Sequence, residues 1–216
     1  MTERTYDQYC GLAGALDLVG ERWTLLIVRE LMSGPKRYTD IADGLAGIGT
    51  SLLARRLAKL ESSGVIERRL IPRPAASTVY ELAPAGHELA AALGPLITWG
   101  LRHALPEAPG DRQVSATWCV LPFTQHADPQ ALAGIEATFE FCVGETSALM
   151  RVHNMHADLL PPGAAEPDVV ISMDAATVAA LGAGRRTIRE AVADGAITVD
   201  GDLKAFAALT AAFESG

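Results

Sequence analysis

Hydrophobic residues repeat at helical spacing through the first third of the chain. Residues 23–32 (WTLLIVRELM) are apolar on nearly every side and predict a buried helix, which the Ser-Gly-Pro sequence at 33–35 ends. Residues 38–45 predict a short second helix, and the segment 46–49 predicts the turn after it. We therefore expect two neighbouring helices that bury their apolar sides in one core.

A third helix is expected to begin with Thr50 or Ser51 as its N-cap and to run to about Ser62. Its leucines fall at i, i+4 and i+7 on one face: Leu53, Leu57 and Leu60. The opposite face gathers Ser51, Leu52, Arg55 and Lys59. One side of this helix is therefore expected to pack, while the other is available to a partner.

The pattern then changes to that of strands. Residues 65–71 and 78–82 predict a hairpin with a basic, proline-containing tip. Residues 85–105 predict another helix, which Pro95 is expected to kink or interrupt. We interpret residues 106–113 as a linker.

The second half of the chain begins with strict alternation. Apolar and polar residues alternate along 135–143, which predicts a half-buried strand, and further strands are expected near 147–153, 169–173 and 196–199. A capping box predicts a helix that starts after Thr187, and an apolar stripe predicts a last amphipathic helix. Residues 114–216 are therefore expected to form an α+β domain with a largely antiparallel sheet.

The net charge of −8 argues against a nucleic-acid binder only until it is divided along the chain. Residues 1–105 contain 12 basic and 11 acidic residues, whereas residues 106–216 contain 6 and 15. Within residues 50–73, six basic residues accompany two acidic ones, a local balance of +4. This segment is a candidate phosphate-binding surface on an acidic protein.

The predicted order of elements is that of a winged helix-turn-helix domain: two helices, a turn, a basic amphipathic helix and a basic hairpin. We assign this domain to residues 1–105. Such a domain places one helix in the major groove of DNA and a wing against neighbouring phosphates. The candidate DNA contacts are Arg37, Thr50, Ser51, Arg55, Arg56, Lys59, Arg68, Arg69 and Arg73. Because Arg68 and Arg69 alternate across a strand, at most one of them is expected to face DNA.

Several separated landmarks occur in the order typical of one family. These are Cys10, GERWT at 20–24, GPKRY at 34–38, residues 60–64, YEL at 80–82, Gly86 and Trp99-Gly100. Over residues 8–103 the chain resembles the HxlR-type winged-helix regulators. The resemblance implies a homodimer formed through the N-terminal and post-wing helices, with one recognition helix on each half of a palindromic operator.

Two departures from the family and one shared residue bear on that resemblance. Tyr38 stands where the family commonly has Phe, and residues 73–77 replace a more acidic wing loop. Cys10 stands where the family often has Cys, which in some members resembles a redox sensor. The simpler interpretation of Cys10, a small apolar residue on a dimerisation helix, is favoured.

Residues 114–215 resemble the sterol-carrier-protein-like lipid-binding fold. The resemblance rests on Asp174 after a strand, the helix end at 189–195 and ITVDGD at 197–202. In that fold a sheet and its helices can enclose an apolar tunnel, or the same side chains can fill an ordinary core. The candidate effector-binding residues are Phe139, Phe141, Met150, Met173, Leu181, Phe206 and Phe213.

Other classes of function find little support in the sequence. Three widely spaced cysteines form neither a zinc motif nor a disulfide framework, and no motif of a nucleophilic, phosphate-binding or zinc-dependent enzyme is present. His153, His156 and Asp158 lack the spacing of a metal site. Without a signal sequence or membrane-spanning run, the protein is expected to be cytoplasmic, non-enzymatic and free of cofactors or metal.

These features together predict a transcription regulator, with repression as the favoured sign, whose acidic second domain binds a small apolar effector. The effector would act by favouring one spacing of the two recognition helices. The alternative is a lipid-carrier or scavenging protein that uses a winged helix only for dimerisation. The basic face of residues 51–59 argues against that alternative.

Overall fold

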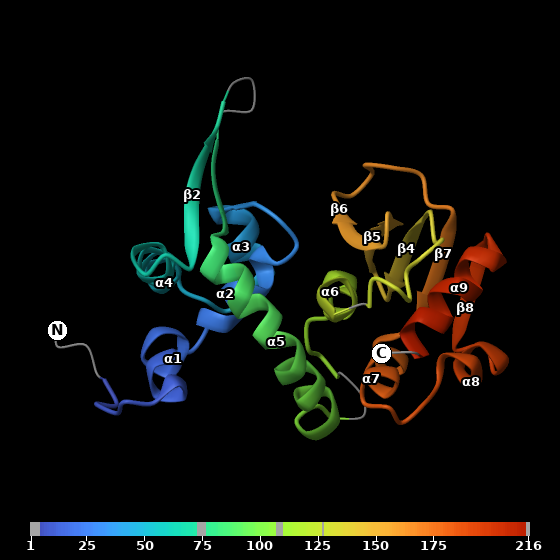
Figure 1. Cartoon of the computed structure of the whole chain (residues 1–216), viewed down its shortest axis with the longest axis horizontal. Helices are drawn as coiled ribbons and strands as arrows, with labels where there is room; N and C mark the ends of the chain where they lie inside the picture. The colour runs from blue at the N-terminus through green and yellow to red at the C-terminus, as the bar shows by residue number, and fades with distance from the viewer. Residues whose placement is uncertain (1–4, 73–76, 107–109, 127, 215–216) are drawn as a thin grey trace. The chain divides into compact units, whose positions relative to one another are not determined.

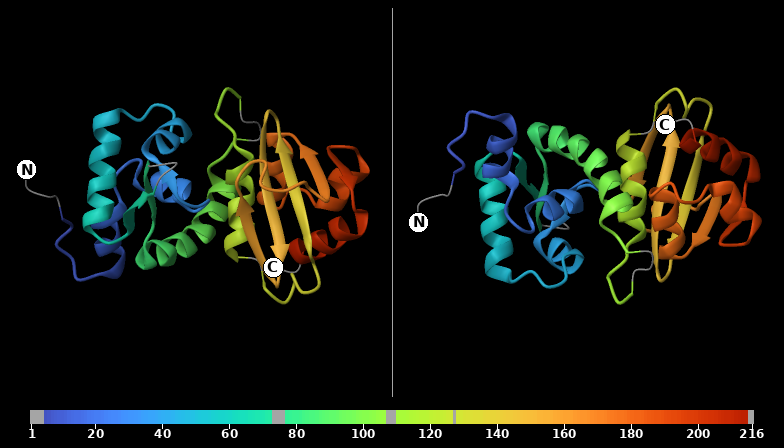
Figure 2. Two further views of the ribbon diagram at one scale, coloured as in Figure 1. Left: turned by 90° about the horizontal axis from the view of Figure 1, so that it is seen from above. Right: turned by 90° about the horizontal axis from the view of Figure 1, so that it is seen from below.

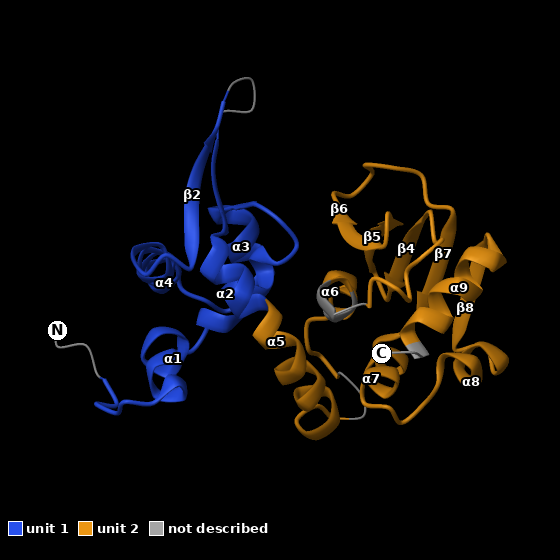
Figure 3. Ribbon diagram, viewed as in Figure 1, with its two compact units in different colours: residues 1–90 blue, residues 91–216 orange. Residues whose placement is uncertain are grey.

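The protein divides into two compact units, Met1–Ala90 and Ala91–Gly216 (Figure 3). The computed structural model describes residues 5–72, 77–106, 110–126 and 128–214. The helix α5 (Pro84–His103) begins in the first unit and ends in the second.

The first unit combines helices with a small antiparallel sheet (Figure 1). The helices that precede α5 are α1 (Gly11–Val19), α2 (Thr24–Leu31), α3 (Tyr38–Gly44) and α4 (Thr50–Ser62). The strands are β1 (Lys36–Arg37), β2 (Ile66–Ile71) and β3 (Ser77–Leu82), in the order β1-β3-β2. Strands β2 and β3 form a hairpin, the wing, which projects beyond the helices (Figure 1).

The core of the first unit joins the three helices that the hydrophobic pattern predicted. Among its fully buried side chains are seven from α2, α3 and α4: Ile27, Val28, Leu31, Ile41, Leu53, Leu57 and Leu60. The predicted leucine face of α4 is therefore the packed face. This arrangement confirms the helix-turn-helix and wing that the sequence predicted for this part of the chain.

Three local features differ from the predictions. The N-cap of α4 is Gly49, whose carbonyl accepts bonds from two amides of the first turn, so the expected cap at Thr50 or Ser51 is wrong. Helix α5 continues through Pro95 without interruption. The short strand β1 was not predicted, because two residues carry no periodicity.

A buried carboxylate connects α2 to the segment that leads into α3. Glu30 is 3% exposed, and its two oxygens accept hydrogen bonds of 2.7 Å from Arg29 and from Lys36 of β1. Gly44, at the end of α3, leaves room for this carboxylate, since a Cβ there would lie 2.5 Å from its Oε2 atom. The Lys36–Glu30 ion pair therefore joins the segment before α3 to α2, and Gly44 lets the end of α3 approach the same carboxylate.

The second unit is an α+β domain built on a five-stranded sheet (Figure 2). The strands are β4 (Ala137–Val143), β5 (Thr146–His153), β6 (His156–Leu160), β7 (Val169–Met173) and β8 (Ile197–Gly201). Their order is β6-β5-β4-β7-β8, and only the β4–β7 pair is parallel. The largely antiparallel sheet is the one that the sequence predicted.

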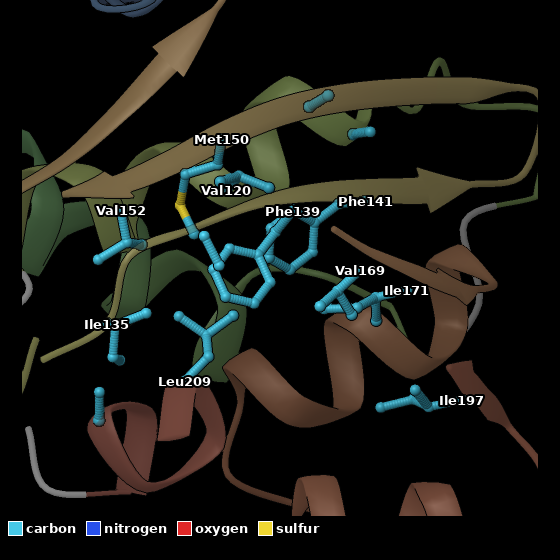
Figure 4. Close-up of a cluster of buried hydrophobic side chains, with 14 of the residues drawn as sticks. Val120, Ile135, Phe139, Phe141, Met150, Val152, Val169, Ile171, Ile197 and Leu209 are labelled. Atoms are coloured by element: carbon cyan, nitrogen blue, oxygen red, sulfur yellow. The ribbon is translucent and has the colours of Figure 1, made fainter. Parts of the chain in front are cut away.

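Helices of the second unit pack against this sheet. They are α6 (Ala116–His126), α7 (Ala175–Gly182), α8 (Ile188–Ala193) and α9 (Leu203–Glu214). In the core, Phe139, Phe141 and Met150 of the sheet meet Val120 of α6 and Leu209 of α9 (Figure 4). The predicted capping box of α8 is present, whereas α6 was not predicted.

Candidate nucleic-acid interface

Helix α4 is held at its first turn by the element before it. The Tyr38 hydroxyl, at the start of α3, donates a hydrogen bond of 2.8 Å to the carbonyl oxygen of Thr50. Phenylalanine, common at this position in the family that the sequence resembles, has no hydroxyl to donate. Tyr38 therefore adds a specific link between the two helices of the motif.

The exposed face of α4 carries polar and basic side chains with small side chains beside them. Thr50, Ser51 and Arg55 are exposed, and the short side chains of Ala54 and Ala58 flank the arginine. Arg55 forms neither an ion pair nor a side-chain hydrogen bond with any residue that the structure describes. Its guanidinium is thus available to an external acceptor.

The other two basic residues of α4 turn toward the protein. Arg56 is only 8% exposed, and its guanidinium bonds to the carboxylate of Glu21 and, at 3.3 Å, to the carbonyl of Arg22. The Lys59 ammonium donates at 3.0 Å to the carbonyl of Asp17. Both residues are therefore placed differently from Arg55, although all three were candidate DNA contacts.

The wing has two chemically distinct faces. Arg69 lies diagonally across from Glu81 and donates two bonds to its carboxylate, at 2.6 and 2.9 Å. These bonds lower the pKa of Glu81 and raise that of Arg69. Arg68 points to the opposite face, where it is exposed together with Leu70, which is 73% exposed.

One further candidate contact lies beside this surface, at the start of α3. Arg37 is exposed at the N-cap of α3, where its backbone amide donates at 2.9 Å to the Asp40 carboxylate. Arg73 lies outside the described residues. The structure therefore brings Arg55 to the exposed side of α4, Arg37 to the start of α3 and Arg68 to one face of the wing.

The candidate effector residues fall into three groups. Phe139, Phe141 and Met150 are buried in the core of the second unit (Figure 4). Three more pack against that core while half-buried: Met173, Leu181 and Phe206. Phe213 is 39% exposed, on α9.

A shallow hollow of about 420 Å³ lies elsewhere in the second unit. Its walls include Asp174 and Thr177 of the start of α7 and the side chains of Arg185 and Arg186. None of the seven candidate effector residues lines it. The hydrogen bonds from Thr177 are the main cause of a lowered pKa for Asp174.

The three cysteines are free thiols in different surroundings. Cys10 is exposed at the N-cap of α1, where the nearby backbone amides of Ala13 and then Leu12 lower the pKa of its thiol. Burial raises the pKa of Cys119 to about 11. Cys10 is thus the more acidic thiol of these two.

The histidines singled out in the sequence do not gather a ligand set. His153 lies 3.7 Å from Asp158 through its Nδ1 atom, and His156 bonds to a neighbouring carbonyl. Among the described residues, no group of three or more His, Cys, Asp or Glu side chains could hold a metal ion. No helix in the described ranges is both long and apolar enough to cross a membrane.

Sequence reasoning missed the acidic residues that organise this part of the molecule. Glu21 and Glu30 hold basic partners that lie close to the candidate interface. Glu21 belongs to the GERWT landmark, which was noted without a physical role. Two adjacent charged residues, Arg29 and Glu30, inside a mainly apolar helix were the available signal for a buried ion pair.

Comparison with known proteins agrees with both halves of this description. Residues 18–108 match the family model of the HxlR-like helix-turn-helix, and residues 120–214 match that of the SCP-2 sterol transfer family. The HTH-type transcriptional regulator YodB of Bacillus subtilis (strain 168) is 34% identical over 88 residues, which are 41% of this chain and 79% of YodB. The uncharacterized HTH-type transcriptional regulator Rv3095 of Mycobacterium tuberculosis is 38% identical over 119 residues, covering 55% of this chain and 72% of Rv3095.

Among solved structures, the reduced form of YodB from B. subtilis aligns with a TM-score of 0.41 and 32% identity, covering 48% of this chain and all of that one (100%). The sequence matches, rather than this alignment, decide the family. The chain belongs to the HxlR family of helix-turn-helix transcriptional regulators and carries an SCP-2-like region in its second half.

Proposed function

We propose that the protein is a sequence-specific DNA-binding repressor that reads the major groove with α4. The observation that carries this proposal is the exposed face of α4, where Thr50, Ser51 and Arg55 lie outward and Arg55 has no partner among the described residues. Arginine can donate two bonds to guanine, and the methyl groups of Ala54 and Ala58 suit thymine. The wing adds Arg68, whereas Arg69 is neutralised by Glu81.

The proposed assembly is a homodimer. Apolar side chains are exposed on α1, where Leu12 (69%) and Leu16 (39%) share one face, and on α5, where Leu96 (50%) and Trp99 (57%) are exposed. A second copy of the chain would bury these side chains and set the distance between two copies of α4. Two half-sites about one helical turn apart would then be bound together.

The proposed effector is a small apolar molecule held in the second half of the chain. The match to a sterol transfer family supports this part of the proposal. The buried positions of Phe139, Phe141 and Met150 make a packed core the simpler interpretation for those three, so the half-buried Met173, Leu181 and Phe206 are the better candidates for ligand contact. Binding would alter regulation only if the effector had different affinities for the DNA-bound and free forms.

The test of this proposal is DNA binding by the full-length chain over a salt series, with the DNA upstream of its own gene as the probe. Tight binding that weakens with salt and exceeds binding to a random duplex is expected. Affinity no greater than for random DNA would contradict the proposal. Native mass spectrometry after incubation with extracted lipids tests the effector, and a change in DNA affinity on lipid addition tests the coupling.

The second candidate function is that of a lipid carrier, which the same family match favours. A carrier would move a fluorescent sterol between vesicles at a rate that depends on the protein and not on DNA. Such transfer without specific DNA binding would favour the carrier. Specific DNA binding without transfer would favour the regulator.

A further inference from the structure

The segment between α1 and α2 places an acidic side chain against the recognition helix. Gly20 ends α1. Its α-carbon lies so close to the preceding turn that a Cβ there would be 2.4 Å from the carbonyl oxygen of Leu16. Trp23 then adopts a positive φ of 79° at the N-cap of α2. Between these two positions the chain turns sharply, and Glu21 points to α4.

Both oxygens of Glu21 are used by α4. Oε2 pairs with the guanidinium of Arg56, and Oε1 lies 3.8 Å from the ammonium of Lys59. Arg56 and Lys59 are three residues apart and therefore project from the same side of the helix. We call Glu21, Arg56 and Lys59 the clamp.

The clamp also provides a hydrogen-bond donor to the C-terminal end of α1. Lys59 donates at 3.0 Å to the carbonyl of Asp17, which lies in the last turn of α1 (Gly11–Val19). The last carbonyls of a helix have no partner within the helix, and a cation there also interacts favourably with the helix dipole. Arg56 bonds in addition to the carbonyl of Arg22, which follows Glu21.

These contacts make it costly for either cation to bind a phosphate. Arg56 is 8% exposed and the Lys59 side chain is 24% exposed, so both side chains are largely shielded from water. Moving either one to DNA would break its ion pair with Glu21 and its hydrogen bond to a backbone carbonyl, of Arg22 for Arg56 and of Asp17 for Lys59. Arg55, by contrast, gives up no bond to a described residue.

We propose that the clamp positions α4 for DNA and that Arg56 and Lys59 are positioning residues rather than phosphate ligands. The proposal rests on the proposed function of α4 as the DNA-reading helix. Because the clamp joins the end of α1 to the middle of α4, the two helices move as one body. The orientation of the recognition helix then follows that of α1, which exposes Leu12 and Leu16 to a partner.

The experiment compares three variants of the full-length chain on a duplex of the DNA upstream of its own gene: Arg55→Met, Lys59→Met and Glu21→Gln. Affinity is measured over a salt series, after circular dichroism and thermal unfolding have shown that each variant is folded. Arg55→Met is expected to weaken binding about tenfold and to reduce the preference for this duplex over a random one, because a donor to a base edge is lost. The slope of log K against log salt reports phosphate contacts and falls by about 0.9 for each one that is lost. Lys59→Met is expected to weaken binding about tenfold with an unchanged slope.

Glu21→Gln tests the sign of the effect. Removing a negative charge beside a DNA-binding helix would raise affinity if only electrostatic attraction mattered. The clamp predicts the reverse, about a tenfold loss with an unchanged salt slope, because α4 loses its anchor. A merely structural role would lower the unfolding temperature and leave the affinity of the folded protein as it was.

The outcomes distinguish a failure of the clamp from a failure of the proposed function of α4. A reduced salt slope for Lys59→Met, a raised affinity for Glu21→Gln, or an unchanged affinity for both would overturn the clamp while Arg55→Met still supports α4 as the reader. An unchanged affinity and an unchanged preference over a random duplex for Arg55→Met would overturn the proposed function, and the clamp with it.

Discussion

The buried carboxylate of Glu30 offers a direct test of how the helix-turn-helix is held together. Glu30→Gln keeps the size of the side chain but removes the charge that faces Arg29 and Lys36, each bonded at 2.7 Å. The two cations would then face a neutral amide in a site where the carboxylate was only 3% exposed. We expect the first unit to be destabilised and the segment leading into α3 to open more often.

The size of the effect follows from burial. Breaking a fully buried ion pair by removing one partner costs about 3–5 kcal/mol. The Arg29 and Lys36 side chains are 18% and 24% exposed, so water recovers part of that loss. About 2 kcal/mol is therefore expected, which corresponds to about 30-fold faster exchange of amides that open with this unit.

Hydrogen–deuterium exchange of peptides from α2 and α3 measures this change without contributions from the second unit. Glu88→Gln, at an exposed position of α5, is the matched control and should change stability by less than about 0.5 kcal/mol. Gly44→Ala should perturb the same site, because its Cβ would lie 2.5 Å from the carboxylate. Equal exchange in Glu30→Gln and Glu88→Gln would refute the reasoning.

Three further predictions concern single sites. Tyr38→Phe should weaken binding to the DNA upstream of the gene about threefold, because the hydroxyl bond to the first turn of α4 is lost; unchanged affinity would contradict this. Gly201→Ala should destabilise the second unit by about 3 kcal/mol or more in thermal unfolding, since φ is +105° and a Cβ would lie 2.1 Å from a carbonyl oxygen. Gly163→Ala, with φ +72° and open space, should cost only about 1 kcal/mol, and equal losses would refute the steric argument. Iodoacetamide at pH 8 should label Cys10, whose pKa is lowered, before Cys119, whose pKa is about 11; mass spectrometry showing the reverse order would contradict this.

The apolar pattern was enough to predict the elements that bury a whole face. Leu53, Leu57 and Leu60 repeat at helical spacing because they pack into one core, and the alternation around Phe139 and Phe141 reflects a sheet with one side against helices. Elements without such a pattern were missed. Strand β1 has two polar residues, and α6 shows no clear apolar stripe.

The site was only partly predictable, because charged residues acquire their roles from distant partners. The helical pattern placed Arg55 and Lys59 on one exposed face, and Arg56 was a candidate contact as well. Only the tertiary position of Glu21 separates Arg55 from the other two. The period of a strand predicted that at most one of two adjacent wing arginines would face DNA. Which one depends on Glu81, a residue on the neighbouring strand.

The central claim is that α4 reads DNA through its exposed face. The most direct test is the ratio of affinities for the DNA upstream of the gene and for a random duplex, measured at one salt concentration for the wild-type chain and for Arg55→Ala. The account predicts a wild-type ratio of about 1,000 or more and a ratio at least about fivefold lower in the variant, because a bidentate base contact contributes about 1–3 kcal/mol to discrimination. A wild-type ratio near one, or a ratio that Arg55→Ala leaves unchanged, would contradict it.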